Sequence, residues 1–318
     1  MLHVISTFMR REPIFVEADI AAPLSDLWAR TQDPALHERW DIRFTAISYR
    51  AAPSAGQPQR FDYETRLGFG ILMRGQGETL AERDPADGTR LSALRFWSDS
   101  RMSLIREGRG YWLYTPTRHG VRFRTGYDYE TRFGAVGRVV DRIAFRPLIG
   151  WATAWSFDRL RLWLEDGIDP ASSGRTALVH GVARAGIAAI FAWHGLVPKL
   201  LGADPIERAM MAAAGMPPDL VVAALRAMGT AELLFAVLLV ATWHRAAPAY
   251  LALAFAGIAT AVTAITSPAL IGAAFTPVTL NLGLGLLAAI DVLTLDGIPA
   301  AGRCRRRPLV AAAAEAPP

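Results

Sequence analysis

Cysteine is nearly absent from this sequence. Cys304 is the only one in 318 residues, which excludes an internal disulfide, a CxxC redox motif and a metal site built from cysteines. The GxSxG, HExxH and Walker motifs are also absent, so the signatures of several common enzyme classes are missing. His37 and His119 lie in predicted loops without a partner at ligand spacing. We therefore expect no catalytic motif, no metal site and no resident cofactor.

Lysine is as rare as cysteine. Lys199 is the only lysine among 34 basic residues, and every other one is arginine. Because an ammonium is more compact than a guanidinium, the single lysine indicates either a local need for the smaller cation or a chance retention.

Asp, Glu, Lys and Arg are all missing from Ala246 to Ile290. A membrane-spanning helix needs roughly 20 apolar residues, and this stretch is long enough for two, separated by the helix breakers Pro268 and Pro277. Two earlier apolar runs predict two further spans. The four expected spans are residues 182–201, 227–243, 248–267 and 276–295. The second half of the chain is therefore predicted to be an all-α transmembrane four-helix bundle.

The first half of the chain is highly charged. Residues 1–176 hold 25 arginines and 22 acidic residues, as expected of a water-soluble domain with its own core. The small positive excess follows no basic stripe, so we expect no nucleic-acid partner. The densest basic cluster, Arg303 with Arg305 to Arg307, follows the last span, where positive charge marks the cytoplasmic side of a membrane protein. The alternative role of this cluster is a lipid or nucleic-acid site.

Four parts are expected along the chain. They are a soluble domain at residues 1–168, a linker of turn-forming residues at 169–177, a membrane domain at 178–297, and a basic, disordered tail at 298–318. Residues 1–11 show no signal-peptide pattern. With four spans, we expect an integral protein of the cytoplasmic membrane whose soluble domain and tail both face the cytoplasm. Lys199, Arg208 and Arg226 argue against this orientation, because their loop would then lie outside.

The soluble half shows a clear order of patterns. Residues 13–20 predict a strand, and residues 22–41 predict two short helices, begun by Pro23 and by Asp33-Pro34. Alternating apolar and charged residues then predict antiparallel strands joined by hairpins, most fully at 121–133. The segment 138–165 lacks this alternation and predicts a long helix with a kink at Pro147. The expected order is one strand, two short helices, about six hairpin strands and one long helix.

This order resembles the START and polyketide-cyclase-like superfamily, also called SRPBCC. The resemblance covers roughly residues 12–166 and is carried by Glu17 to Trp28, by Asp33 to Asp41, and by Trp155, Phe157 and Leu160 in the last helix. It implies an α+β helix-grip fold, in which a curved antiparallel sheet surrounds a long C-terminal helix. It also implies a pocket for an apolar or aromatic ligand. The expected pocket wall is Tyr63, Trp112, Phe123, Tyr127, Tyr129, Trp151 and Trp155; the alternative is that these side chains simply pack the core.

The membrane half resembles the DoxX-like membrane proteins. The matching residues are the run from Ala192 to Leu200, the loop from Glu207 to Gly215, Gly229 to Glu232, and Pro277 to Leu282. The resemblance implies a four-helix membrane module related to proteins of quinone-linked sulfur oxidation, so a quinone is the one cofactor it suggests. No cysteine lies in the spans to perform thiol chemistry.

Three ionisable residues are expected inside the spans. His194, Lys199 and Glu232 would be costly to bury singly in a bilayer, so we expect them to form one polar cluster. Three roles stay open for it: structural glue between helices, a site for a quinone or a polar headgroup, and a proton path. Asn281 and Asp291 are weaker candidates, with Asp291 expected at the interface.

The leading hypothesis is a membrane-tethered protein that binds a hydrophobic small molecule (a lipid, quinone or aromatic compound) in a non-enzymatic or accessory role. An enzyme is the second hypothesis, either a quinone-linked oxidoreductase subunit or a cyclase-like enzyme using Asp99, Glu107 or Asp128. A structural membrane scaffold is the third. A membrane protein partner or a homo-oligomer stays open, with Gly283 and Gly285 available for close helix contact.

Overall fold

The structure, a computed structural model, describes residues 12–51, 57–66, 70–83, 88–202, 204–274 and 276–308. The chain forms two compact units. The first holds the described residues up to Ser173 together with those from Pro299 onward, and the second is Gly174–Ile298. The chain therefore leaves the first unit once and returns to it once.

One seven-stranded antiparallel sheet dominates the first unit, in the order β1-β7-β6-β5-β4-β3-β2. The strands are β1 (Ile14–Ile20), β2 (Ala46–Tyr49), β3 (Arg60–Arg66), β4 (Leu72–Arg83), β5 (Arg90–Trp97), β6 (Ile105–Thr117) and β7 (Gly120–Thr131). Strands β2 to β7 pair with their neighbours in sequence, and β1 completes the edge beside β7. The predicted opening strand and run of six further strands are confirmed.

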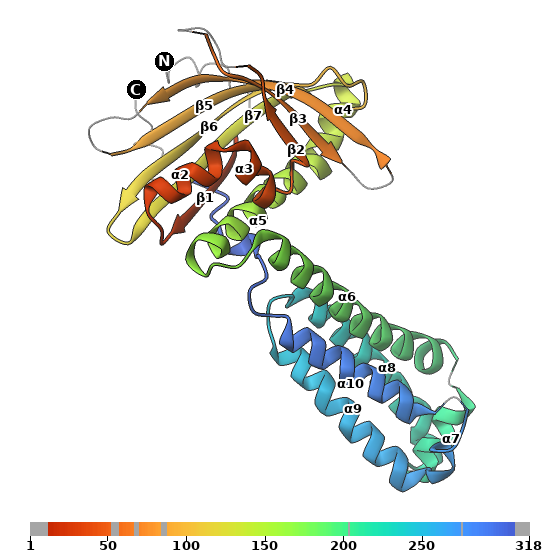
Figure 1. The fold of residues 1–318 in the computed structure, drawn as a ribbon. Helices are drawn as coiled ribbons and strands as arrows, with labels where there is room; N and C mark the ends of the chain where they lie inside the picture. Colours follow the sequence, from red (N-terminus) through yellow and green to blue (C-terminus); the bar gives the residue numbers. More distant parts are fainter. Residues whose placement is uncertain are drawn as a thin grey trace. The chain divides into compact units, whose positions relative to one another are not determined.

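Helices lie on one face of this sheet (Figure 1). They are α2 (Leu24–Gln32), α3 (Pro34–Trp40), α4 (Gly134–Val140), the π-helical segment η2 (Asp141–Phe145) and α5 (Arg146–Glu165). Asp33 starts α3, because its carboxylate accepts a hydrogen bond from the Ala35 amide at 2.9 Å and Pro34 occupies the first turn. Phe123 of β7 stacks on Phe157 of α5 at 4.4 Å, which fixes the long helix on the sheet. The first unit thus has the α+β helix-grip architecture.

The long helix is interrupted earlier than expected. The predicted kink at Pro147 is instead the π-helical segment η2, which ends just before that residue. Proline has no amide hydrogen, and its ring crowds the carbonyl four residues back, Ile143, so the regular hydrogen-bond pattern fails over the preceding turn. Pro147 itself lies in the first turn of α5, where a missing amide costs little.

The C-terminal segment corrects the expected disordered tail. Ala301 and Cys304 are buried in the core of the first unit, and Arg305 forms an antiparallel bridge with Glu17 of the edge strand β1. Two backbone hydrogen bonds of 2.9 Å join these two residues. A short segment with small apolar residues can thus cover a sheet edge, which sequence periodicity does not reveal. Residues 309–318 of the expected tail lie outside the described part.

The second unit contains the apolar helices. They are α6 (Pro170–His194), continued by the π-helical η3 (Gly195–Leu201), then α7 (Pro205–Ala213), α8 (Pro218–Ala241), α9 (Ala247–Thr266) and α10 (Pro277–Leu293). The expected linker 169–177 is wrong from residue 170 onward, because Asp169 accepts the Ala171 amide at 2.8 Å and caps a helix that Pro170 opens. Three helices are long and apolar enough to cross a membrane, and α10 is a shorter apolar helix.

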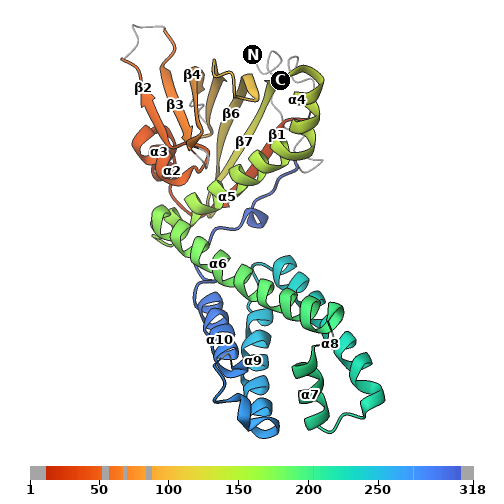
Figure 2. The same ribbon diagram turned by 90° about the vertical axis from the view of Figure 1, so that its right-hand side faces the viewer.

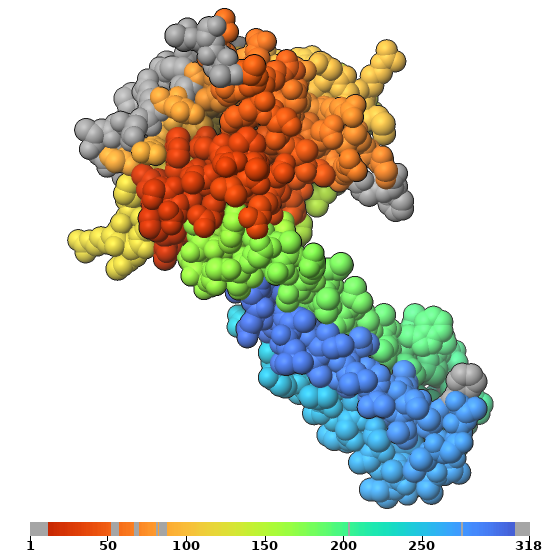
Figure 3. Space-filling model, viewed as in Figure 1, coloured from red at the N-terminus to blue at the C-terminus, as the bar shows by residue number. Residues whose placement is uncertain are grey.

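The distribution of small and large apolar side chains in the second unit is that of a bundle surrounded by lipid. Helices α9 and α10 run side by side (Figure 2), and the space-filling view shows their two segments in contact on this face of the molecule (Figure 3). Its core uses small residues such as Ala252, Ala256 and Ala288, whereas Leu234, Ile258 and other large apolar side chains are exposed. Small residues between helices and large apolar residues outside are typical of a membrane bundle.

Two helices of the second unit approach each other closely at a pair of glycines. A Cβ atom on Gly283 would meet nothing within 4 Å, whereas one on Gly229 of α8 would lie 2.6 Å from the Gly195 carbonyl oxygen. The two backbones therefore touch where η3 crosses α8. Only glycine permits that distance.

Candidate functional site

A cavity of about 320 Å³ lies inside the first unit. Side chains from β2 to β7 line it, together with residues of α2, α3, η2 and α5 and the segment that follows α3. Most of its wall is apolar or aromatic, with a few polar groups at His37 and Arg43. This size and composition are typical of small-molecule sites.

Three of the seven expected pocket residues line the cavity: Tyr63, Trp112 and Tyr127. The other four do not, because alternation identifies a face of the sheet but not its covered part. Phe123 is fully buried under α5, and Tyr129 donates a 2.6 Å hydrogen bond to Asp141. Trp151 is exposed, and Trp155 packs against the core cluster of the first unit without lining the cavity.

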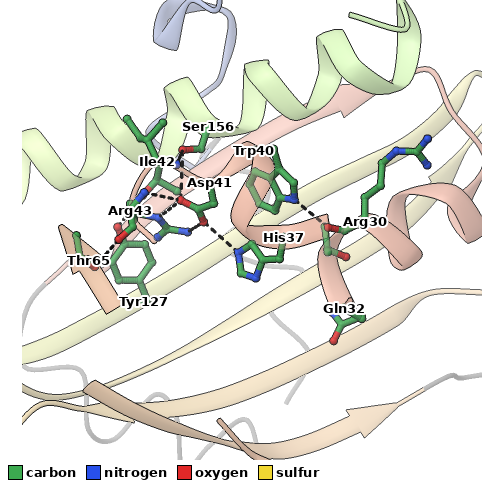
Figure 4. A network of polar contacts seen from close by, with 12 residues as sticks. Arg30, Gln32, His37, Trp40, Asp41, Ile42, Arg43, Thr65, Tyr127 and Ser156 are labelled. Carbon is green, nitrogen blue, oxygen red and sulfur yellow. Dashed lines mark hydrogen bonds and ion pairs between the residues drawn. The ribbon is translucent and has the colours of Figure 1, made fainter. Parts of the chain in front are cut away.

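A buried carboxylate organises the polar part of the wall (Figure 4). Asp41 follows α3 directly and is fully buried. Arg43 donates to both of its oxygens, from Nε at 2.9 Å and from Nη2 at 2.6 Å. Burial by itself raises the pKa of Asp41, but the charge and hydrogen bonds of Arg43, with help from His37, outweigh it and hold that pKa well below its usual range. Asp41 is therefore ionised at neutral pH.

His37 connects this carboxylate to the cavity. Its Nε2 lies 3.2 Å from Asp41 Oδ2, and its ring lines the cavity. The ring stacks on Trp40 at 4.9 Å and meets the edges of Phe44 and Trp112 at 5.3 and 4.9 Å. These rings hold the imidazole in one orientation.

Two tyrosine side chains, Tyr127 and Tyr63, also contribute to the cavity wall. Tyr127 shares a 2.8 Å hydrogen bond with Thr153 of α5, and its ring lies below the Arg43 guanidinium carbon at 5.6 Å. Burial raises the pKa of Tyr63 to about 12, so its hydroxyl stays protonated and can donate. The tyrosines supply neutral polar groups to an otherwise apolar wall.

Sequence reasoning missed His37, Asp41 and Arg43. His37 was expected to have no partner at ligand spacing, but on the short helix α3 a residue four positions later shares its face. The spacing of His37 and Asp41 was the available signal. The expected acid–base candidates Asp99, Glu107 and Asp128 do not line the cavity, and Glu107 and Asp128 pair with arginines. In the described ranges no three His, Cys, Asp or Glu residues gather as a metal site would require.

In the second unit, Lys199 is buried among acceptors. Its Nζ lies 3.1 Å from Glu232 Oε1 and 3.2 Å from Glu207 Oε1, and it donates to the His194 carbonyl oxygen at 3.4 Å. The structure thus brings Lys199 and Glu232 together, adds Glu207 of α7, and uses the backbone of His194 instead of its imidazole. Glu232 lies in the second half of α8, which begins at Pro218.

A second buried charged group was not expected. Arg184 of α6 is fully buried and pairs with Asp291 of α10, and His180 lies 3.1 Å from Asp291 Oδ1. Arg184 also donates to the carbonyl oxygens of Leu239, Thr242 and Arg245 around the end of α8. Asp291 is therefore buried inside the bundle, near the end of α10. The spacing of His180 and Arg184 on one helix face was the signal in the sequence.

The fold and these sites define a membrane protein in which a soluble cavity-bearing domain is joined to a helical membrane domain. Residues 188–289 match the model of the DoxX-like family, so the chain carries a DoxX-like domain. An uncharacterized membrane protein of Bacillus subtilis (strain 168), YndG, is 46% identical over 173 residues. That match covers 54% of this chain and 64% of YndG, less than two thirds of its length.

Solved structures resemble the first half of the chain. TTHA0849 of Thermus thermophilus is 17% identical and covers 49% of this chain and 98% of its own, with a TM-score of 0.38. The di-domain aromatase/cyclase StfQ of steffimycin biosynthesis is 14% identical, with 49% and 51% covered and a TM-score of 0.35. A STAR-related lipid transfer protein of Xanthomonas axonopodis is 14% identical, with 46% and 82% covered and a TM-score of 0.36. Because these TM-scores are low, the fold assignment of the first unit rests on its own sheet and helices and not on these similarities.

Proposed function

We propose that this protein binds a hydrophobic small molecule in the cavity of its soluble unit while its apolar helices hold it in the membrane. The observation that carries the proposal is the cavity of about 320 Å³ with a mostly apolar and aromatic wall. Apolar surface around an apolar ligand is the main source of affinity in such a site. A scaffold protein has no need for an internal cavity in a core that otherwise packs tightly.

The surroundings of the cavity support a ligand of low water solubility. Leu148 of α5 lines the cavity and is also 61% exposed. The preceding segment exposes Val136, Val139 and Ile143, which form a run of large apolar side chains on α4 and η2. An apolar molecule therefore meets apolar side chains outside the cavity as well as inside it.

The test is to identify what the full-length protein retains. The protein is purified from its membrane in mild detergent, and its small molecules are extracted and analysed by mass spectrometry. Ala152 lines the cavity, so Ala152→Phe fills part of it, whereas Ala144 is exposed on η2 and Ala144→Phe serves as the control. We expect one compound to be lost from Ala152→Phe and kept by Ala144→Phe. Equal retention, or none in any variant, contradicts the proposal.

The soluble unit is proposed to face the cytoplasm. The support is the arginine cluster Arg303 and Arg305 to Arg307, which belongs to the part of the chain after α10. The single native cysteine is buried, so Asp99→Cys on the exposed surface gives a clean probe. An impermeant thiol reagent should label it in broken cells and not in intact ones. Labelling of intact cells reverses the orientation.

An acid–base enzyme is the second candidate, as in a cyclase-like activity. The observation that favours it is the inward imidazole of His37, oriented by an ionised carboxylate. Cell extract incubated with the wild-type protein should then lose a compound that survives incubation with His37→Phe. If both proteins leave the extract unchanged, the binding role stands alone.

A further inference from the structure

His37 presents an unused hydrogen-bond acceptor to the cavity. Asp41 is ionised and accepts hydrogen bonds only, so the ring nitrogen that faces it, Nε2, must carry the hydrogen. In the neutral ring, Nδ1 then carries the lone pair. No group in the described part of the chain bonds to Nδ1. The ring that carries this nitrogen lines the cavity and contacts the rings of Trp40, Phe44 and Trp112.

The neighbouring charge adds a second requirement. Arg43 lines the same cavity, and its Nε and Nη2 are committed to Asp41. The guanidinium lies against the rings of Phe44 and Tyr127, at 5.5 and 5.6 Å from their centres. A cation and an acceptor nitrogen that line one cavity together favour a ligand group that donates a hydrogen and gains negative charge on its oxygen. An acidic hydroxyl has this property, and an ether or a hydrocarbon does not.

The rest of the wall defines the body of the ligand. Aromatic side chains from five strands, including Phe61, Tyr63, Phe96 and Trp112, line the same cavity as His37. Flat rings stack well on such walls. Figure 4 shows the imidazole between α5 and the strands, with Asp41 on one side of the ring.

We propose that the cavity selects an apolar, ring-containing molecule with one phenolic or enolic hydroxyl, which donates its hydrogen to His37 Nδ1 in the cavity that Arg43 also lines. This inference rests on the proposed binding function and names the chemical class of its ligand. Asp41 acts as a positioning residue that fixes the tautomer, and His37 is the residue that touches the ligand.

The experiment compares two probes that differ in one donor. Full-length protein in mild detergent is titrated with 2-naphthol and with 2-methoxynaphthalene, and binding is followed by quenching of tryptophan fluorescence. Wild-type protein should bind 2-naphthol about tenfold more tightly, the effect of one hydrogen bond to a buried acceptor. His37→Phe keeps the ring stack but lacks the acceptor. The variant should therefore bind 2-naphthol and 2-methoxynaphthalene about equally, with the affinity for 2-methoxynaphthalene unchanged from wild type.

The possible outcomes test the hydroxyl assignment and the binding function separately. Equal binding of both probes by wild-type protein, or an unchanged preference in His37→Phe, overturns the hydroxyl assignment and leaves the binding function intact. Failure of both probes to bind wild-type protein contradicts the binding function itself. If His37→Phe does not fold, His37→Leu, which also lacks an acceptor, takes its place. The loss of preference is then measured in the same way.

Discussion

Arg184 Nη1 lies 2.5 Å from Asp291 Oδ2 and joins α6 to α10 within the membrane bundle. Both side chains are almost completely removed from the surface. Because Arg184 also bonds to three backbone carbonyl oxygens at the end of α8, one side chain ties three helices together. Buried charge in a bilayer is tolerated only when it is paired in this way.

Arg184→Ala should destabilise the bundle by about 3–5 kcal/mol, because it removes the cation paired with a buried carboxylate and the donor to several carbonyl groups. Thermal unfolding of the full chain in detergent measures the effect. Arg226→Ala is the matched control, since Arg226 is exposed on α8. The double variant Arg184→Met, Asp291→Leu should recover most of the loss, because no charge is then left unpaired. Equal midpoints for Arg184→Ala and the control contradict the assignment.

Gly229→Ala should lower stability by about 1–3 kcal/mol, the usual cost of overpacking a tight contact. The new methyl group would lie 2.6 Å from the Gly195 carbonyl oxygen and 2.9 Å from Lys199 Cβ. Gly257→Ala on α9 provides the control, because nothing lies within 4 Å of its added carbon. That change should leave stability equal or higher by up to about 1 kcal/mol, since alanine favours a helix. A similar loss in both variants would mean that the close contact is not the cause.

Glu232→Gln tests the role of the Lys199 cluster, for which we propose structural glue. Glu232 is more buried than Glu207, and one of its oxygens, Oε2, has no hydrogen-bond partner within the described structure. We expect Glu232→Gln to lower the unfolding midpoint more than Glu207→Gln, because the deeper charge has less access to water. If Glu232→Gln folds normally and loses a small molecule that Glu207→Gln keeps, the cluster is a ligand site instead.

Asp41→Asn should destabilise the soluble unit by about 3 kcal/mol at pH 7, because it removes the counter-ion of Arg43. The pKa of Asp41 is held below the ordinary value of 3.8, so the unfolded chain binds its proton more readily than the folded chain. The stabilisation from this carboxylate is therefore complete above about pH 4 and is lost as the pH falls further. Urea unfolding of both proteins between pH 7 and pH 3 should show the difference shrinking. A constant difference would exclude Asp41 as its source.

Removal of the C-terminal segment should weaken the soluble unit by about 3 kcal/mol, with roughly 1 kcal/mol for each lost hydrogen bond. A chain that ends at Ile298 loses the 2.7 Å bond from the Ala300 amide to Asp158 and both backbone bonds between Arg305 and Glu17. A chain that ends at Pro308 keeps all of them and serves as the control. Differential scanning calorimetry of the full membrane protein separates the two. Identical transitions would show that the segment adds nothing.

Cys304 offers an independent probe of the same segment. Burial, with the negative charge of Asp158, raises the pKa of this thiol to about 12, and its Sγ lies 3.3 Å from the Ala154 carbonyl oxygen. The thiol is therefore protonated and shielded at neutral pH, and a maleimide should label it only slowly until the protein unfolds. Rapid labelling of the folded protein would place the segment away from the core.

The sequence by itself predicted the order and type of nearly every element, because strands and helices leave their own periods in it. Alternation at β7, the Asp33-Pro34 helix start and the charge-free stretch after Ala246 each depend on local chemistry. Hydrophobic length likewise identified the apolar helices α6, α8, α9 and α10. These signals do not need distant residues to be placed.

Only the tertiary structure decided which residues contact one another. Tyr63, Trp112 and Tyr127 could be expected at the cavity from their strand faces, but Phe123 has the same alternation and is covered by α5. The pairing of Arg184 with Asp291 joins residues 107 positions apart, and the contact of Ala300 with Asp158 joins residues 142 positions apart. Periodicity carries no information about such distances. The sequence therefore determined the elements, and the packing of those elements determined the sites.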